Sequence, residues 1–225
     1  MLKRSEKVRL GWLVGVLVTG VTIGYFINVE AGQKALPVFN PSDVNPKLVD
    51  ESVRNVQHDH HIKDFQLLNQ EGRSISKKDL ESKVYVADFF FTTCQGICLD
   101  MAVQMKRVYD AYEDDPRVMF ISHSVMPQRD SVSVLAEYAG KQNASVEKWM
   151  FLTGEKTEIY DLARKSYFAV TTEGDGGEAD FIHTENFILI DTKQRIRGYY
   201  DGTSPEDVDR LIQDISVLLK EGDSD

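Results

Sequence analysis

In residues 56–221, short apolar runs typical of strands take turns with segments whose apolar residues recur at the spacing of a helix. The clearest segment is residues 84–91 (VYVADFFF), an almost unbroken apolar run that predicts a central, buried strand. Further strands are expected over residues 64–68, 117–125, 149–152, 187–191 and 195–200, the last two as a hairpin. Helices are expected over residues 76–81, 97–113, 130–141, 155–165 and 205–219. This alternation predicts an α/β domain whose sheet carries helices on both faces.

A second kind of apolar segment lies near the N-terminus. Residues 10–27 (LGWLVGVLVTGVTIGYFI) are 18 residues without a charge, and as a helix they would reach ~27 Å, close to the ~30 Å hydrocarbon core of a bilayer. Basic residues dominate residues 1–9, which predicts a cytoplasmic N-terminus and places the rest of the chain across the membrane. We interpret residues 10–27 as one uncleaved transmembrane anchor. A cleaved signal peptide is the alternative, although no convincing cleavage site follows.

The anchor and the domain are joined by residues 28–55, which contain Pro37, Pro41 and Pro46 among polar residues and are expected to form an extended tether. No Arg- and Ser-rich transit segment precedes the anchor, so a bacterial inner membrane, with the domain on its periplasmic side, is favoured over a mitochondrial one.

Charge is divided unevenly between the two ends of the chain. The whole sequence has 26 basic and 36 acidic residues, of which residues 1–27 hold four and one, so residues 28–225 carry 22 against 35, a net charge of −13. This acidic body argues against a nucleic-acid partner. The two cysteines exclude a disulfide-rich scaffold and a four-cysteine zinc site.

Both cysteines lie where the apolar strand ends and a helix begins, in the segment FFFTTCQGICLDMAVQM. In α/β proteins, ligands bind at the carboxyl ends of the strands. A helix N-terminus also lowers the pKa of a thiol, because its exposed N–H groups favour the thiolate. Cys94 and Cys98 therefore suit either a redox-active pair that closes into a disulfide or a clamp for one soft metal ion.

Three segments resemble the Sco/SenC family: FTTCQGIC, VMFISHSVMPQRDS and HTENFILIDTKQRIRGYYDGT. The resemblance covers about residues 56–220 and implies a thioredoxin-like fold with a central mixed sheet, tethered to a membrane. It also implies that Cys94, Cys98 and His183 bind one copper ion, as Cu(I) or Cu(II). The implied function is assembly of the binuclear copper site of cytochrome c oxidase, with the copper-site subunit, and a further copper chaperone or thiol reductant, as partners. Two thiolates and one imidazole suit copper in either oxidation state.

Three features depart from the pattern common in that family. The residue after the second cysteine is Leu99 rather than proline, and Gln95-Gly96 stands where an acidic residue is common between the cysteines. The segment at residues 122–127 (SHSVMP) also replaces a Val-Asp-Pro pattern that is common in the family. A less anionic site would alter copper affinity or the preferred oxidation state.

A general thiol–disulfide oxidoreductase of thioredoxin type is the alternative function. Asp88 favours it, because Asp88 precedes Cys94 by six residues, as the buried aspartate of thioredoxins does. The Cys-x-x-x-Cys spacing opposes it, since such enzymes use Cys-x-x-Cys. The absence of proline between residues 128 and 204, where thioredoxins have a cis-proline, opposes it too.

Other candidate ligands have simpler interpretations. His58, His60 and His61 suggest a second metal site, but we expect them to form a solvated junction. Met101 and Met105 are expected to pack in the core. His123 is considered as a further group near the metal, Asp88 as part of a core hydrogen-bond network, and the acidic residues 173–180 as a solvated loop.

Overall fold

The structure is a computed structural model that describes Trp12 and residues 35–94, 96–170, 177 and 180–222. Its contacts divide the chain into Met1–Ala35 and Leu36–Asp225, and the second unit is described below. Within the described residues, no helix is both long enough and apolar enough to cross a membrane. The anchor expected at residues 10–27 lies outside the described residues apart from Trp12.

A mixed sheet of five strands forms the centre of the described unit, in the order β5-β4-β3-β6-β7. The central strand is β3 (Val84–Phe90), and β4 (Val118–Ser124) and β5 (Trp149–Leu152) extend the sheet in parallel on one side. On the other side β6 (Asn186–Ile190) and β7 (Ile196–Asp201) form the expected hairpin, and β6 pairs antiparallel with β3. The predicted mixed α/β architecture is confirmed.

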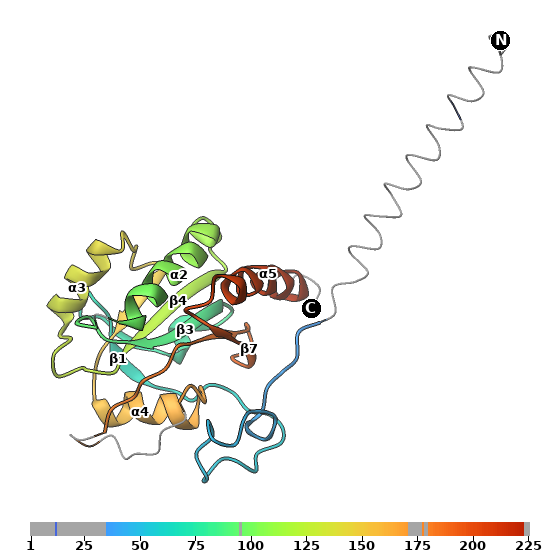
Figure 1. Ribbon diagram of the computed structural model, residues 1–225, viewed down its shortest axis with the longest axis horizontal. Helices are drawn as coiled ribbons and strands as arrows, with labels where there is room; N and C mark the ends of the chain where they lie inside the picture. The colour runs from blue at the N-terminus through green and yellow to red at the C-terminus, as the bar shows by residue number, and fades with distance from the viewer. Residues whose placement is uncertain (1–11, 13–34, 95, 171–176, 178–179, 223–225) are drawn as a thin grey trace. The chain divides into compact units, whose positions relative to one another are not determined.

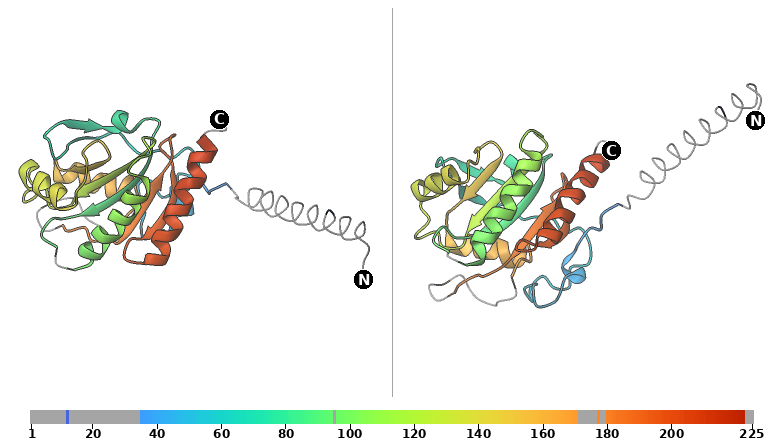
Figure 2. Two further views of the ribbon diagram at one scale, coloured as in Figure 1. Left: turned by 90° about the horizontal axis from the view of Figure 1, so that it is seen from above. Right: turned by 45° about the horizontal axis from the view of Figure 1, so that its top comes forward.

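Helices cover both faces of the sheet (Figure 1 and Figure 2). One apolar cluster joins the sheet to α2 (Ile97–Tyr112), α3 (Val132–Lys141) and α5 (Pro205–Gly222). The other joins the opposite face to α4 (Lys156–Lys165). Because both faces are covered, all seven residues of β3 are buried, as expected for a central strand with little polar alternation.

The side chains of β3 alternate between the two faces. Val84, Val86 and Phe90 pack in the cluster under α2, α3 and α5. Tyr85 and Phe89 pack in the cluster on the α4 side. By this alternation Asp88 lies on the α2 side of the sheet, directly before the loop that carries the cysteines.

The segment before β3 is more elaborate than expected. β1 (Gln66–Leu68) pairs with a short strand, β2 (Ser74–Ser76), which the polar sequence does not reveal. The helix expected over residues 76–81 is a single 3-10 turn, η2 (Lys77–Leu80), and the carboxylate of Asp79 accepts hydrogen bonds from the N–H and hydroxyl of Ser76.

The structured unit also begins earlier than residue 56. Residues 36–55 are not an extended tether, because Phe39 forms a β-bridge with Ile196 and the side chains of Val44 and Val49 are buried in the core cluster on the α4 side. A 3-10 turn, η1 (Pro41–Asp43), follows Phe39. Proline-rich polar sequence is typical of linkers, but here scattered apolar residues fasten it to the domain.

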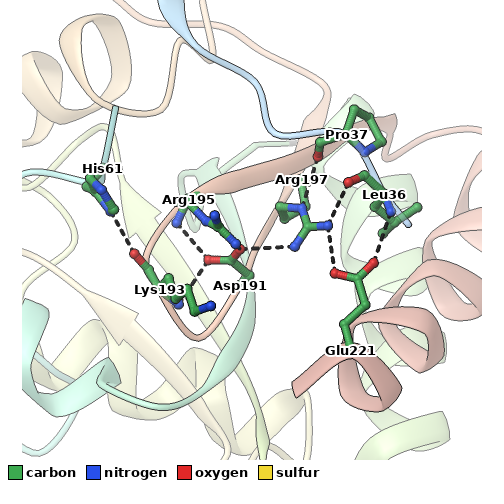
Figure 3. A network of polar contacts seen from close by, with 8 residues as sticks. All are labelled: Leu36, Pro37, His61, Asp191, Lys193, Arg195, Arg197 and Glu221. Atoms are coloured by element: carbon green, nitrogen blue, oxygen red, sulfur yellow. Dashed lines mark hydrogen bonds and ion pairs between the residues drawn. The ribbon is translucent and has the colours of Figure 1, made fainter. Parts of the chain in front are cut away.

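Arg197 fastens the first described residues of this unit (Figure 3). Its guanidinium is buried, at 5% exposure, and donates to the backbone oxygens of Leu36 and Pro37 at 2.6 and 3.0 Å. The same group pairs with Asp191 at 3.1 Å and with Glu221 at 2.7 Å. One side chain thus ties the start of the unit to the β6–β7 hairpin and to the end of α5.

Candidate functional site

The two cysteines lie together on the loop between β3 and α2, as the sequence predicts. The loop begins with a turn directly after β3, in which the N–H of Cys94 donates to the backbone oxygen of Phe91 at 3.3 Å. Gly96 precedes the first residue of α2, so Cys98 lies in the first helical turn. Both cysteines are free thiols; Cys94 is partly exposed and Cys98 is buried. The arrangement presents one sulfur to solvent with a second behind it.

The two thiols differ in acidity. Burial alone would raise the pKa of Cys94, but hydrogen bonds from the Cys98 thiol and from the backbone amides of Gly96 and Cys98 outweigh burial and lower it. Burial, together with the hydrogen bond to Cys94, raises the pKa of Cys98 to about 12. Cys94 is therefore the more acidic thiol of the pair.

A buried carboxylate holds the loop that leads to Cys94. Asp130, 1% exposed, accepts hydrogen bonds from the backbone N–H and the hydroxyl of Thr92 at 3.2 and 2.5 Å, and from the hydroxyl of Ser124 at 2.6 Å. We expected residue 130 to begin a helix, but α3 begins at Val132 and Ser131 caps it. Asp130 instead joins the loop after β3 to the end of β4 through hydrogen bonds.

Asp88 belongs to a hydrogen-bond network in the core, as expected. It accepts a hydrogen bond from the hydroxyl of Ser122 at 2.5 Å, and Ser122 accepts one from the indole N–H of Trp149 at 2.9 Å. Burial raises the pKa of Asp88 to about 7. Its charge in turn helps to raise the pKa of Cys98, so this carboxyl acts electrostatically on the buried thiol of the pair.

His183 lies on the segment that leads into β6, and its side chain is exposed. Two residues earlier, the ring of Phe181 packs edge-on against Phe91 with centroids 5.5 Å apart, and Phe91 stands three residues before Cys94. This contact joins the segment of His183 to the cysteine loop. Among the described residues, no three His, Cys, Asp or Glu side chains are gathered closely enough to hold a metal ion. The structure thus brings the two loops together but does not bring the imidazole to the thiols.

His123 lies away from the cysteines. It is fully buried on the α4 side of the sheet, stacked on Phe89 at 4.9 Å and tilted against Tyr167 at 5.3 Å. Burial lowers its pKa to about 4. His123 is therefore a neutral core residue. It lies on the face of the sheet opposite to α2, the helix that carries Cys98.

The solvated junction expected at the start of the domain is confirmed in part: His58 and His61 are exposed, but His60 is buried. The ring of His60 lies tilted against that of Phe168, with centroids 4.6 Å apart, and donates from Nε2 to the backbone oxygen of Ser166 at 2.8 Å. His61 is exposed and contacts the backbone oxygen of Lys193 at 2.7 Å (Figure 3). These contacts point in different directions, so nothing gathers the pair around one ion. Met101 and Met105 are buried in the core, as predicted.

The acidic segment at residues 173–180 lies largely outside the described residues. Its last residue, Asp180, is not solvated as expected, because its carboxylate forms an ion pair with Arg164 on α4 at 2.7 Å. Neither this pair nor the Asp130 network is identifiable from the sequence, since their partners lie 6 to 38 residues apart without a spacing rule. For the Phe91–Phe181 contact the sequence does offer a signal, since aromatic residues stand close to both Cys94 and His183.

Comparison with known proteins agrees with this arrangement. The family described as SCO1/SenC matches residues 53–220. The SCO1 protein homolog of Bacillus subtilis is 31% identical over 158 residues, which cover 69% of this chain and 81% of the relative. A solved structure of BsSco, described as a member of the Sco family of cytochrome c oxidase assembly proteins with a disulfide switch, is 30% identical with a TM-score of 0.61, covering 71% of this chain and 93% of that one.

Copper-bound Arabidopsis thaliana ScoI is similar in fold, with a TM-score of 0.54 at 23% identity, covering 68% of this chain and 97% of that one. The family match begins at residue 53, before β1, and ends at residue 220 in α5. It therefore includes the cysteine loop and the segment of His183. The chain therefore belongs to the SCO1/SenC family.

Proposed function

We propose that this protein binds one copper ion through Cys94, Cys98 and His183 and acts in the assembly of the binuclear copper site of cytochrome c oxidase. It would deliver copper to that site or reduce the thiols there. We further propose that residues 10–27 anchor it in a bacterial inner membrane with the domain on the periplasmic side. Its partners would be the copper-site subunit and a second copper chaperone or a thiol reductant.

The observation that carries the proposal is the pairing of the two thiols beside the segment of His183. Thiolates favour Cu(I), and an added imidazole permits Cu(II) as well. The Phe91–Phe181 contact holds the segment of His183 next to the cysteine loop, and a movement that brings the exposed imidazole to the two thiols would complete a three-ligand site. Family membership supports the same three residues.

The acidity of the thiols supports binding with proton release. Cys94 has a lowered pKa and is the more acidic of the two thiols, whereas the pKa of Cys98 is about 12. Metal ligation requires deprotonated sulfur, so copper must displace the proton from Cys98. Copper affinity is therefore expected to rise with pH.

General dithiol exchange is the second candidate, and Asp88 is the observation that favours it. A buried carboxyl with a pKa of about 7, electrostatically coupled to Cys98, is suited to take a proton when Cys98 attacks a disulfide. The two functions are compatible, because a copper site made of cysteines must be reduced before it can be filled.

The test is copper stoichiometry. The full-length chain is purified in mild detergent, reduced, and titrated with Cu(I) under anaerobic conditions, and bound metal is measured by native mass spectrometry. We expect one copper per chain in the wild type and loss of tight binding in Cys94→Ser, Cys98→Ser and His183→Ala. Wild-type binding by all three variants would refute the proposal. Disulfide reduction at the rate of a thioredoxin, without copper binding, would favour the alternative.

A separate test addresses the anchor. The full-length chain should remain with the membrane fraction after carbonate extraction, and added protease should reach the domain from the periplasmic side. Release by carbonate would contradict the anchor, and protection of the domain in intact spheroplasts would contradict its placement.

A further inference from the structure

The segment that carries His183 is held on both sides of the histidine. On its N-terminal side, Asp180 accepts hydrogen bonds from both terminal nitrogens of Arg164, each at 2.7 Å. Both side chains are nearly inaccessible, with exposures of 6% and 8%. A bidentate guanidinium–carboxylate pair of this kind fixes orientation as well as distance. Asp180 is therefore a fixed point three residues before His183.

Two further side chains of α4 bind the same segment. Lys156 donates to the backbone oxygens of Gly177 and Asp180, each at 2.6 Å. The hydroxyl of Tyr160 accepts a hydrogen bond from the N–H of Ile182 at 3.4 Å. Lys156, Tyr160 and Arg164 are spaced four residues apart, so they form one stripe along the helix. This stripe faces the segment that leads to His183.

The C-terminal side of the histidine is held as well. The hydroxyl of Thr184 donates to the backbone oxygen of Ala169 at 2.7 Å, and the amide of Asn186 donates to the same oxygen at 3.0 Å. Ile182 is 1% exposed, whereas His183 itself is exposed. The backbone around His183 is thus pinned at residues 180, 182 and 184 while the imidazole projects outward.

Tyr160 also connects this segment to the strand that precedes the cysteines. Its hydroxyl donates to the backbone oxygen of Val125 at 3.0 Å, and the N–H of Val125 donates to the oxygen of Phe90 at 2.8 Å. Phe90 is the last residue of β3, four residues before Cys94. A continuous hydrogen-bonded route therefore links the end of β3 to Ile182, next to His183.

We propose that α4, through Arg164 and Tyr160, is the positioning element of the copper site and sets how readily His183 reaches Cys94 and Cys98. This inference rests on the proposed function. A buried ion pair adds little net stability when compared with apolar replacements, so stability alone does not account for its placement here. Arg164 and Tyr160 contact no thiol in the described hydrogen-bond network and would act only through His183.

The test compares Arg164→Met with a matched control, Arg197→Met, in the full-length chain. Both changes remove the guanidinium of a buried ion pair. The Arg197–Asp191 pair lies at the other end of the sheet from the cysteines, because Asp191 follows Ile190 and Ile190 pairs with Tyr85 at the start of β3. Copper affinity is measured by competition with a chromophoric Cu(I) chelator, and melting temperature is recorded for each variant.

We expect Arg164→Met to weaken copper binding 10- to 100-fold, as is typical when a group that orients a metal ligand is lost. Arg197→Met should lower the melting temperature and leave copper affinity within twofold of the wild type. If Arg164 acts through His183, the double variant Arg164→Met/His183→Ala should bind copper no more weakly than His183→Ala alone.

The inference is overturned if Arg164→Met binds copper as tightly as the wild type, or if it weakens binding equally with and without His183. Should Arg164→Met fail to fold, Tyr160→Phe replaces it: the ring stays, the hydroxyl is lost, and about a fivefold weakening is expected. Unchanged affinity in Tyr160→Phe would then overturn the inference. If His183→Ala itself binds as the wild type does, the proposed ligand set fails and the inference fails with it.

Discussion

Replacing Asp88 by asparagine should stabilise the protein at pH 8 and not at pH 4. Asp88 is buried beside Ser122, and burial raises its pKa from 3.8 to about 7. The folded state therefore holds a proton that the unfolded chain has released between about pH 4 and pH 7. Stability from this group is fully present below about pH 4 and is lost as pH rises through about 7. An asparagine at this position would stay neutral at every pH and could still accept the hydrogen bond from Ser122.

The magnitude follows from the pKa difference. Each pKa unit corresponds to ~1.4 kcal/mol, so about three units predict a gain of roughly 4 kcal/mol at pH 8. Urea denaturation of the reduced, copper-free protein from pH 4 to pH 8 measures it. His123 also titrates in the folded state, with a pKa of about 4. Because His123 is present in both proteins, the difference between the two curves isolates Asp88.

A matched control is the same substitution at Asp130. Its two carboxylate oxygens accept hydrogen bonds from Thr92 and Ser124, and in asparagine one of these oxygens is replaced by an NH₂ group that cannot accept. Asp130→Asn should therefore destabilise the protein by ~1–3 kcal/mol, opposite in sign to Asp88→Asn at pH 8. A pH-independent effect of Asp88→Asn, or a loss of stability at pH 8, would refute the reasoning.

Three further changes have defined outcomes. At pH 7, iodoacetamide should modify Cys94 at least tenfold faster than Cys98, read by mass spectrometry of Cys98→Ser and Cys94→Ser; equal rates would contradict the assigned pKa directions. His123→Phe should not destabilise the protein, because among the described residues Nε2 of His123 has no hydrogen-bond partner and the ring stacks on Phe89; a loss above ~2 kcal/mol in urea denaturation would show that the imidazole is needed. Arg197→Met should destabilise the protein by ~1–3 kcal/mol, because the backbone oxygens of Leu36 and Pro37 lose their donor while Asp191 keeps its ion pair with Arg195. Limited proteolysis should then cut near Leu36; resistance equal to that of the wild type would contradict the fastening role.

The strands and helices of the domain could be predicted because their signals are local. The unbroken apolar run of β3 and the amphipathic pattern of α2 each follow from burial on a regular element. The position of Cys94 and Cys98 at the end of β3 followed from the same pattern. A strand such as β2, with the sequence Ser-Ile-Ser, has one buried residue and no such signal.

The rest depended on contacts between distant segments. Residues 36–55 were expected to be a tether because prolines and polar residues dominate them, yet Val44 and Val49 pack into the core and Arg197 binds their N-terminal neighbours. Likewise the pairing of Asp180 with Arg164 depends on how the chain returns over α4. No periodicity encodes such contacts, so the sequence predicted where Cys94, Cys98 and His183 lie along the chain but not the contacts that hold the segment of His183.

X-ray absorption at the copper edge of the copper-loaded, full-length protein tests the central claim most directly. The proposed site predicts two sulfur ligands and one imidazole nitrogen on a single copper ion. His183→Ala should lose the imidazole contribution and keep both sulfurs, and Cys94→Ser should lose one sulfur. A copper ion surrounded only by nitrogen and oxygen, or a spectrum unchanged in His183→Ala, would contradict the account.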